Sequence, residues 1–319
     1  MKQKLNLPTL VFMVMMTFSL SSCTEEKSQL SFPLSAEIFK SIVDKQVAFT
    51  ALTHSAVSWA WDFGDGKSST EKNPVHVYAE GGYYKATLTA KDATGASVVK
   101  EVKLAIALTQ YALLTGDHTD PKYKGKTWKL SADHSTHGDY LATADANLTT
   151  MDPDITPLPT GAFGLYLGLG EVYDDTYTFF FDGKFGHDLK ADKAAFGGIV
   201  HQLKTNGGAG IVKMSSISDF PLCTAKYTPE TGATFTYVAK EDLSVASAYG
   251  PPNYVVTYKG VSTLNFSGTE FLGFMDKQRK VIVQEITDRT MKVVMFAALH
   301  PTYYPLNTTA LVLSFEVVD

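Results

Sequence analysis

Short runs in which apolar and polar residues alternate recur along this chain, and turn residues such as Gly, Asn, Asp and Pro separate them. Gln46–Leu52, Tyr84–Ala90 and Ser97–Leu104 are three such runs in the first third of the sequence. A period of two places successive side chains on opposite faces of a strand, whereas an α-helix repeats about every 3.6 residues. No segment keeps a helical period over a useful length, so the sequence predicts an all-β protein of antiparallel strands.

The composition limits the classes of function to consider. The chain has 319 residues, which is enough for two domains of ordinary size. Its net charge is only −5 and no basic run stands out, so we expect no nucleic acid partner. Charged residues make up 19% of the chain, beside 16 Tyr and 19 Phe. This balance is typical of an extracellular β-rich protein, although a strand-rich core accounts for the aromatic residues equally well.

The N-terminal residues have the order of a secretory signal. Two lysines precede an apolar run, Leu5–Leu20, which is shorter than the roughly 20 residues of a membrane-spanning helix. The run closes on Leu20-Ser21-Ser22-Cys23, which resembles the lipobox of bacterial lipoproteins. The resemblance implies a signal peptide over residues 1–22 and an acyl anchor on Cys23 that holds the protein to a membrane. The alternative is an ordinary signal peptide with a coincidental Cys.

The segment after Cys23 is polar and partly acidic, and we interpret residues 23–31 as a tether. Thr24-Glu25-Glu26-Lys27-Ser28 is similar to the export signal of Bacteroidetes lipoproteins that reach the outer face of the outer membrane. The resemblance implies a lipid-anchored outer-membrane protein exposed at the cell surface, whereas a solvated tether has the same composition. Cys223 is the other Cys, so we expect no intramolecular disulfide in the processed chain and a small buried side chain at this position.

Three motifs mark the first domain. Trp61 to Gly66 reads W-D-F-G-D-G, Asn73 to Tyr78 reads N-P-V-H-V-Y, and Gly81–Tyr84 contains a G-x-Y element. Their order and spacing resemble a PKD domain. The resemblance implies an immunoglobulin-like β-sandwich over residues 32–107 that acts as a spacer between the membrane and a binding module.

The same residues have structural roles that follow from their chemistry. Trp61 and Phe63 lie two apart, so they share a strand face and can enter the core together. The carboxylates of Asp62 and Asp65 can accept backbone N–H bonds and hold the turn. Trp59 could serve as a platform for a sugar ring, but a Trp on a strand more often packs against its neighbours.

We predict a second all-β domain over residues 108–319. Tyr177–Phe181, Asp182-Gly183 and Lys184–Gly186 have the pattern of a hairpin with a tight turn. A large number of strands in about 200 residues predicts a two-sheet jelly roll for this domain. The expected fold of the whole chain is an immunoglobulin-like sandwich followed by a jelly-roll sandwich. The further predicted strands cover residues 234–238, 254–258, 262–266, 281–286, 291–296 and 310–317.

Several segments of this domain resemble a module of Bacteroidetes surface lipoproteins that is often encoded with glycan-uptake systems. The matches are Lys126–Leu130, Val172–Phe179, Leu264–Gly268 and His137-Gly138, the last being similar to an H-x-G loop. The resemblance implies binding of a β-glucan or related polysaccharide, beside an outer-membrane uptake complex. Related modules carry a Trp-Trp pair after that loop, and Thr143–Gly161 has none, so a different ligand or tyrosine-based binding is expected.

Binding of a sugar requires flat aromatic faces with polar groups beside them. Tyr249 and Tyr254 flank a stiff Pro-Pro pair, and Tyr303 and Tyr304 follow in a second Pro-bounded loop. We predict that these four tyrosines and His137 bind glycan. The alternative is that each tyrosine packs beneath its own loop.

The catalytic and metal-binding patterns are weak. No E-x-D-x-x-E strand of a jelly-roll glycosidase is present, and Glu171–Asp175 has the wrong pattern for paired carboxylates. A lyase would need basic residues beside a Tyr/His pair, and His134 and His137 near Tyr140 are a weak match. We therefore predict no catalytic residues and no enzyme. We expect no cofactor other than a possible structural Ca²⁺. The alternative is that the acidic residues form a solvated loop without a metal ion. The candidate oxygen donors for that ion are Asp152, Asp154, Asp174 and Asp175.

These predictions combine into a cell-surface lipoprotein that captures a β-glucan-like polysaccharide for a glycan-uptake system. One alternative is an adhesion or scaffold lipoprotein that binds a protein partner. Another is a polysaccharide-degrading enzyme with an unfamiliar active site.

Overall fold

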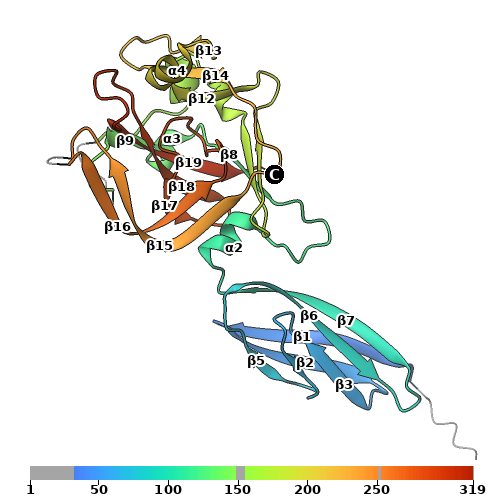
Figure 1. Ribbon diagram of the computed structural model, residues 1–319. Coiled ribbons are helices and arrows are strands. Elements are labelled where there is room, and N and C mark those ends of the chain that lie inside the picture. Colours follow the sequence, from blue (N-terminus) through green and yellow to red (C-terminus); the bar gives the residue numbers. More distant parts are fainter. Residues whose placement is uncertain (1–31, 149–154, 251–252, 319) are drawn as a thin grey trace, which may run out of the picture.

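The computed structural model describes residues 32–148, 155–250 and 253–318, and within these ranges the chain forms two domains (Figure 1). The prediction of an all-β chain, with an immunoglobulin-like sandwich followed by a jelly-roll β-sandwich, is confirmed. Cys23, Asp152 and Asp154 lie outside the described residues, as does the predicted signal peptide. Within the described ranges, no helix is both long and apolar enough to cross a membrane.

The N-terminal domain is a sandwich of two antiparallel sheets, with strand orders β1-β2-β5 and β4-β3-β6-β7. Strand β6 pairs with β7 over its whole length, and β1 pairs with β2 in the same way, because both hairpins have short turns. The strands are β1 (Ser35–Val43), β2 (Gln46–His54), β3 (Ser58–Asp62), β4 (Ser68–Ser69), β5 (Val75–Val77), β6 (Gly82–Lys91) and β7 (Ser97–Ile106).

Aromatic side chains fill the core of this domain, as the motifs predict. Trp61 and Phe63 are both 2% exposed, and the ring of Phe49 packs against both. In the turn, the Asp62 Oδ1 atom accepts the Gly64 N–H at 2.9 Å, which confirms the expected role of this carboxylate. The sequence motifs therefore act through packing and turn geometry.

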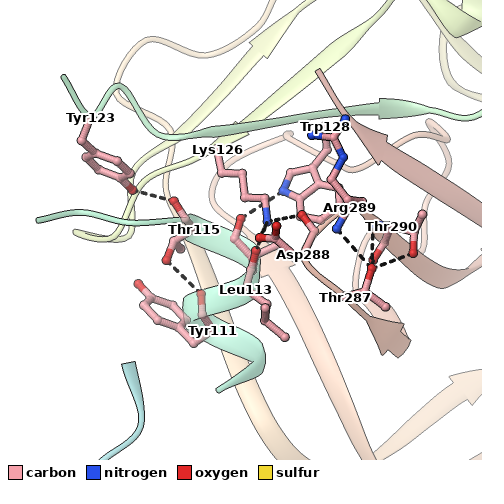
Figure 2. Close-up of polar contacts among 11 residues, drawn as sticks. Tyr111, Leu113, Thr115, Tyr123, Lys126, Trp128, Thr287, Asp288, Arg289 and Thr290 are labelled. Carbon is pink, nitrogen blue, oxygen red and sulfur yellow. Dashed lines mark hydrogen bonds and ion pairs between the residues drawn. The ribbon is translucent and has the colours of Figure 1, made fainter. Parts of the chain in front are cut away.

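A short helix, α2 (Gln110–Thr115), begins the second domain directly after β7. Figure 2 shows how α2 is held: the Lys126 Nζ atom donates to the carbonyl oxygens of Leu113 and Asp288, each at 2.7 Å. The Trp128 indole N–H donates to the Leu114 carbonyl at 3.0 Å. The carbonyl groups of Leu113 and Leu114 lie in the last turn of α2. The contacts with Lys126 and Trp128 therefore attach the helix to β8.

The second domain is built on a nine-stranded antiparallel sheet of order β11-β10-β8-β19-β18-β17-β16-β15, with β9 also paired to β19. The sheet curls until its outer strands meet: the Phe185 N–H donates to Ala233 O at 2.8 Å and the Phe235 N–H to Gly183 O at 2.9 Å. The strands are β8 (Lys126–Leu130), β9 (Tyr140–Thr143), β10 (Thr176–Phe179), β11 (Phe185–Asp188), β15 (Phe235–Ala246), β16 (Val255–Phe266), β17 (Val281–Ile286), β18 (Thr290–Ala297) and β19 (Thr309–Val317).

The inner face of the curled sheet encloses the main core, in which Trp128, Phe179 and Phe315 are fully buried. The opposite face carries a second apolar cluster that includes Val294 and Phe296 of β18. A small sheet of order β12-β14-β13 packs over one end together with helix α4, at the top of Figure 1. These elements are β12 (Ala194–Gly198), α4 (Ile199–Asn206), β13 (Ile211–Met214) and β14 (Leu222–Lys226), and the remaining short helices are α3 (His134–His137), η1 (Ala162–Tyr166) and η2 (Gly170–Tyr173).

Two strand predictions are wrong. Residues 254–258 and 262–266 belong to one strand, β16, because the bulges in its pairing with β15 absorb Gly260 at φ +63° without ending the strand. In the segment Val172–Phe179, which resembles a strand of the lipoprotein module, β structure begins only at Thr176, because η2 extends to Tyr173. The hairpin between β10 and β11 is confirmed, with Phe179 opposite Phe185.

Candidate binding groove

A large groove lies beside β9, between the α4 unit and the loop that precedes β19. It is open to solvent and has a volume of about 1290 Å³. Val200 and Leu203 of α4 line it, together with Tyr249 and Leu299. Most of the lining is apolar, and its acidic and basic side chains are Asp219 and His300.

Two loops that are distant in the sequence are joined at this groove. The Ala248 N–H donates to Asn307 O at 2.9 Å, and the Asn307 Nδ2 atom donates to Ala246 O at 2.7 Å. Gly250 permits the tight return of the first loop, because a Cβ atom there would lie 2.8 Å from the Val255 nitrogen. The contacts therefore place the loop of Tyr249 beside the Pro301–Pro305 loop.

The predicted tyrosines differ in their exposure. Tyr249 lines the groove and is 43% exposed. Tyr303 is 45% exposed, and its ring centroid lies 4.9 Å from that of His300, a lining residue. Tyr304 is half-buried. Tyr254 is exposed on the same loop as Tyr249 but does not line the groove.

His137 lies elsewhere. It borders a separate polar depression of about 390 Å³ with Lys129, Arg289 and Glu316. The structure therefore gathers the two tyrosine loops at one groove and leaves His137 out of it. Which of these residues bind a ligand stays a prediction.

A buried polar contact supports the groove wall. Asp276 accepts the backbone N–H groups of Lys277 at 2.6 Å and Ala298 at 3.1 Å, and its Oδ1 atom lies 3.7 Å from His201 Nδ1. Burial raises the pKa of Asp276 and lowers that of His201, so both groups are shifted toward their neutral forms. The Tyr304 hydroxyl lies 3.5 Å from the same His201 nitrogen. The contact links α4 to the Pro301–Pro305 loop.

Among the described residues considered for catalysis or metal binding, Tyr140 lines the groove, whereas His134, His137, Asp174 and Asp175 do not. His134 is fully buried, where its ring bonds to Asp139 at 2.7 Å and to the Tyr173 hydroxyl at 2.9 Å. Asp175 is 2% exposed, and burial raises its pKa to about 8. Asp174 and Asp175 join no cluster of three or more His, Cys, Asp or Glu side chains suited to a metal ion within residues 32–148, 155–250 and 253–318.

Two other predictions about single side chains concern packing. Cys223 is fully buried, as predicted, and burial raises the pKa of its thiol to about 12. Trp59 is half-buried; its indole N–H donates to the Thr53 hydroxyl at 3.3 Å, and the Lys72 ammonium lies 5.3 Å from the ring centroid. These contacts favour the packing role of Trp59.

Sequence reasoning missed Phe220 as a residue of the groove. Phe220 lines the groove and is 42% exposed, and Pro221 and Leu203 line it too. The Phe220-Pro221 pair resembles the Pro-bounded tyrosine loops in composition, which was the one local signal available. Its place in the same groove as Tyr249 depends on contacts between segments that are distant in the chain.

Comparisons with known proteins identify the first domain. Residues 40–106 match the family model of the PKD domain. The chain is 31% identical over 162 residues to "Collagenase ColQ1" of Bacillus cereus (strain Q1), a match that covers 38% of this chain and 17% of the collagenase. The chain thus spans less than a fifth of that relative's length.

Solved structures give weaker similarities. The PKD1 domain of Vibrio anguillarum Epp is 26% identical, covers 25% of this chain and 99% of its own, and has a TM-score of 0.24. A carbohydrate-binding module of the β-sandwich superfamily is 14% identical over 91% of this chain and 93% of its own, with a TM-score of 0.26. The fold of the second domain therefore rests on the strand pairing described above.

Proposed function

We propose that this protein is a cell-surface lipoprotein that captures a β-glucan-like polysaccharide in the groove of its C-terminal domain. The observation that carries the proposal is the presence of two exposed rings, Tyr249 and Phe220, in the lining of one open and mostly apolar groove. The C–H faces of sugar rings pack on aromatic rings, while polar groups at the rim bind hydroxyls. Asn147, Asp219 and His300 supply such groups.

The remaining parts of the proposal concern the position of the groove in the cell. An acyl anchor on Cys23 would tether the chain to the outer membrane. The PKD domain would act as a spacer, because α2 attaches directly to the second domain and leaves only a short connection after β7. A glycan held there would be available to a neighbouring outer-membrane uptake complex.

Affinity electrophoresis tests the proposal. The chain is run through gels that contain laminarin, mixed-linkage β-glucan, xylan, galactomannan or amylopectin. We expect retardation by at least one β-glucan, and weaker retardation of Tyr249→Ala. Tyr166→Ala is the matched control, because Tyr166 is 56% exposed and lines none of the grooves described here. Equal migration in every gel would contradict the proposal, and release of reducing ends would favour an enzyme.

A second candidate function is binding of a protein partner. The outward face of the β1-β2-β5 sheet exposes apolar side chains, and patches of this kind mark interaction surfaces. The similarity to a collagenase makes fibrillar collagen the first partner to test. If the chain co-sediments with collagen fibrils and Phe39→Ser weakens this co-sedimentation, the result would support protein binding over glycan capture. The exposed apolar residues are Phe39, Val43, Leu52, Val75 and Val77.

A further inference from the structure

A second open groove, of about 760 Å³, lies on the outer face of the nine-stranded sheet. Strands β16 and β17 supply much of its lining, and Lys292 of β18 completes it. Tyr140, Ala146 and Asn147 line both this groove and the larger one. The two grooves therefore adjoin along one face of the sheet.

Internal hydrogen bonds hold the segment that the two grooves share. The Tyr258 hydroxyl donates to Ala144 O at 2.8 Å, and the Gln284 Nε2 atom donates to Leu148 O at 2.6 Å. The Tyr258 ring in turn packs on Phe296, with ring centroids 5.4 Å apart. Because sheet residues fix both ends of segment 144–148, the junction between the grooves is built into the fold.

The chemistry of the lining changes from one groove to the other. The larger groove carries exposed aromatic rings and one acidic and one basic side chain, Asp219 and His300. The smaller groove carries hydrogen-bonding and charged groups of both signs. These groups are Asp145, Lys259, Gln284, Glu285 and Lys292. Stacking surfaces thus lie at one end and hydroxyl-binding groups at the other.

We infer that the two grooves form one continuous trough that holds an internal stretch of a glycan chain. Sugar rings stack on the aromatic side chains near Tyr249, at the apolar end of the trough. Sugar hydroxyls farther along the glycan form hydrogen bonds at the polar end, near Lys259. Both grooves are open, so recognition does not require a chain terminus. The inference rests on the proposed glycan binding and adds that affinity depends on the length of the chain.

Isothermal titration with an oligosaccharide ladder tests the trough. The ladder, from disaccharide to octasaccharide, is prepared by graded acid hydrolysis of the polysaccharide that retards the chain in gels. Affinity should rise with length until an oligomer spans both grooves. Lys259→Ala should then weaken the longest oligomer about tenfold, the equivalent of about 1.4 kcal/mol, and leave the trisaccharide unchanged. Tyr249→Ala should weaken every length.

Controls separate the possible outcomes. Lys259 is an exposed side chain, so its substitution should leave the fold intact, and Lys91→Ala on the exposed surface of the PKD domain should change no affinity. Asp145→Asn offers a second probe of the polar groove. Equal affinity at all lengths, with no effect of Lys259→Ala or Asp145→Asn, would overturn the trough and leave the proposed function intact. No binding of polymer or oligomers would overturn both.

Discussion

Asp175 is a buried carboxyl group on the residue that precedes β10. It is 2% exposed, and its Oδ2 atom has no hydrogen-bond partner among the described residues. Burial, and then the nearby charges of Asp192 and Asp174, raise its pKa to about 8, from about 3.9 in an unfolded chain. The folded protein therefore retains a proton that the unfolded chain releases.

This shift predicts a pH-dependent stability. Its contribution is complete below about pH 4 and is lost as the pH rises through about 8, because deprotonation then leaves a buried charge. Asp175→Asn removes the ionisation. The Tm of the variant minus the Tm of the wild type should therefore increase between pH 5 and pH 9. Thermal melts across this range measure the gap. A gap that stays constant with pH would show that Asp175 does not titrate as described.

At the scale of elements, one ammonium group joins α2 to the turn that precedes β18. Lys126 is the shared donor to the Leu113 and Asp288 carbonyl oxygens, and it lies 4.7 Å from the Trp128 ring centroid. Lys126→Met keeps the aliphatic length but leaves both oxygens without this donor. We expect a loss of about 1–3 kcal/mol in the free energy of unfolding, measured by chemical denaturation. Lys124→Met, at an exposed neighbour, should have no such effect; equal losses in both variants would argue against a specific role.

The predictability of the elements follows their periodicity. Val281–Ile286 has the predicted bounds, because its run of β-branched residues ends at the Thr287-Asp288-Arg289 turn. Ala194–Gly198 was missed, since all five residues are buried and no alternation is present. Helix α4 has only eight residues, too few for a clear helical pattern. The groove wall comes from these missed elements, so its position could not be predicted, whereas the loop of Tyr249 could be.

At the scale of the whole molecule, the two domains have separate cores. One cluster draws all its buried residues from the N-terminal domain, and the main cluster begins at Leu114. We predict two thermal transitions in calorimetry, and independent folding of a fragment of residues 32–107. Phe49→Ala should cost about 3–5 kcal/mol and lower only the transition of the PKD domain. A single transition that shifts as a whole would mean that the domains unfold together.

The proposed membrane anchor gives a further prediction at this scale. Wild-type chain expressed in a bacterium should incorporate labelled palmitate and sediment with membranes, because acyl chains on Cys23 add membrane affinity for each buried methylene. Cys23→Ala should abolish the label and move the protein to the soluble fraction, whereas Cys223→Ala should do neither. Labelling that survives Cys23→Ala would refute the anchor.

The central claim is that a polysaccharide occupies the groove of the C-terminal domain. Hydrogen–deuterium exchange with and without the retained polysaccharide tests it most directly, since bound ligand slows exchange of the backbone it covers. We predict protection in the segments around Tyr249, Phe220 and Pro301, extending to the segment around Lys259 for a glycan long enough to fill the trough. Protection only in the β1-β2-β5 sheet, or none at saturating polysaccharide, would contradict the claim.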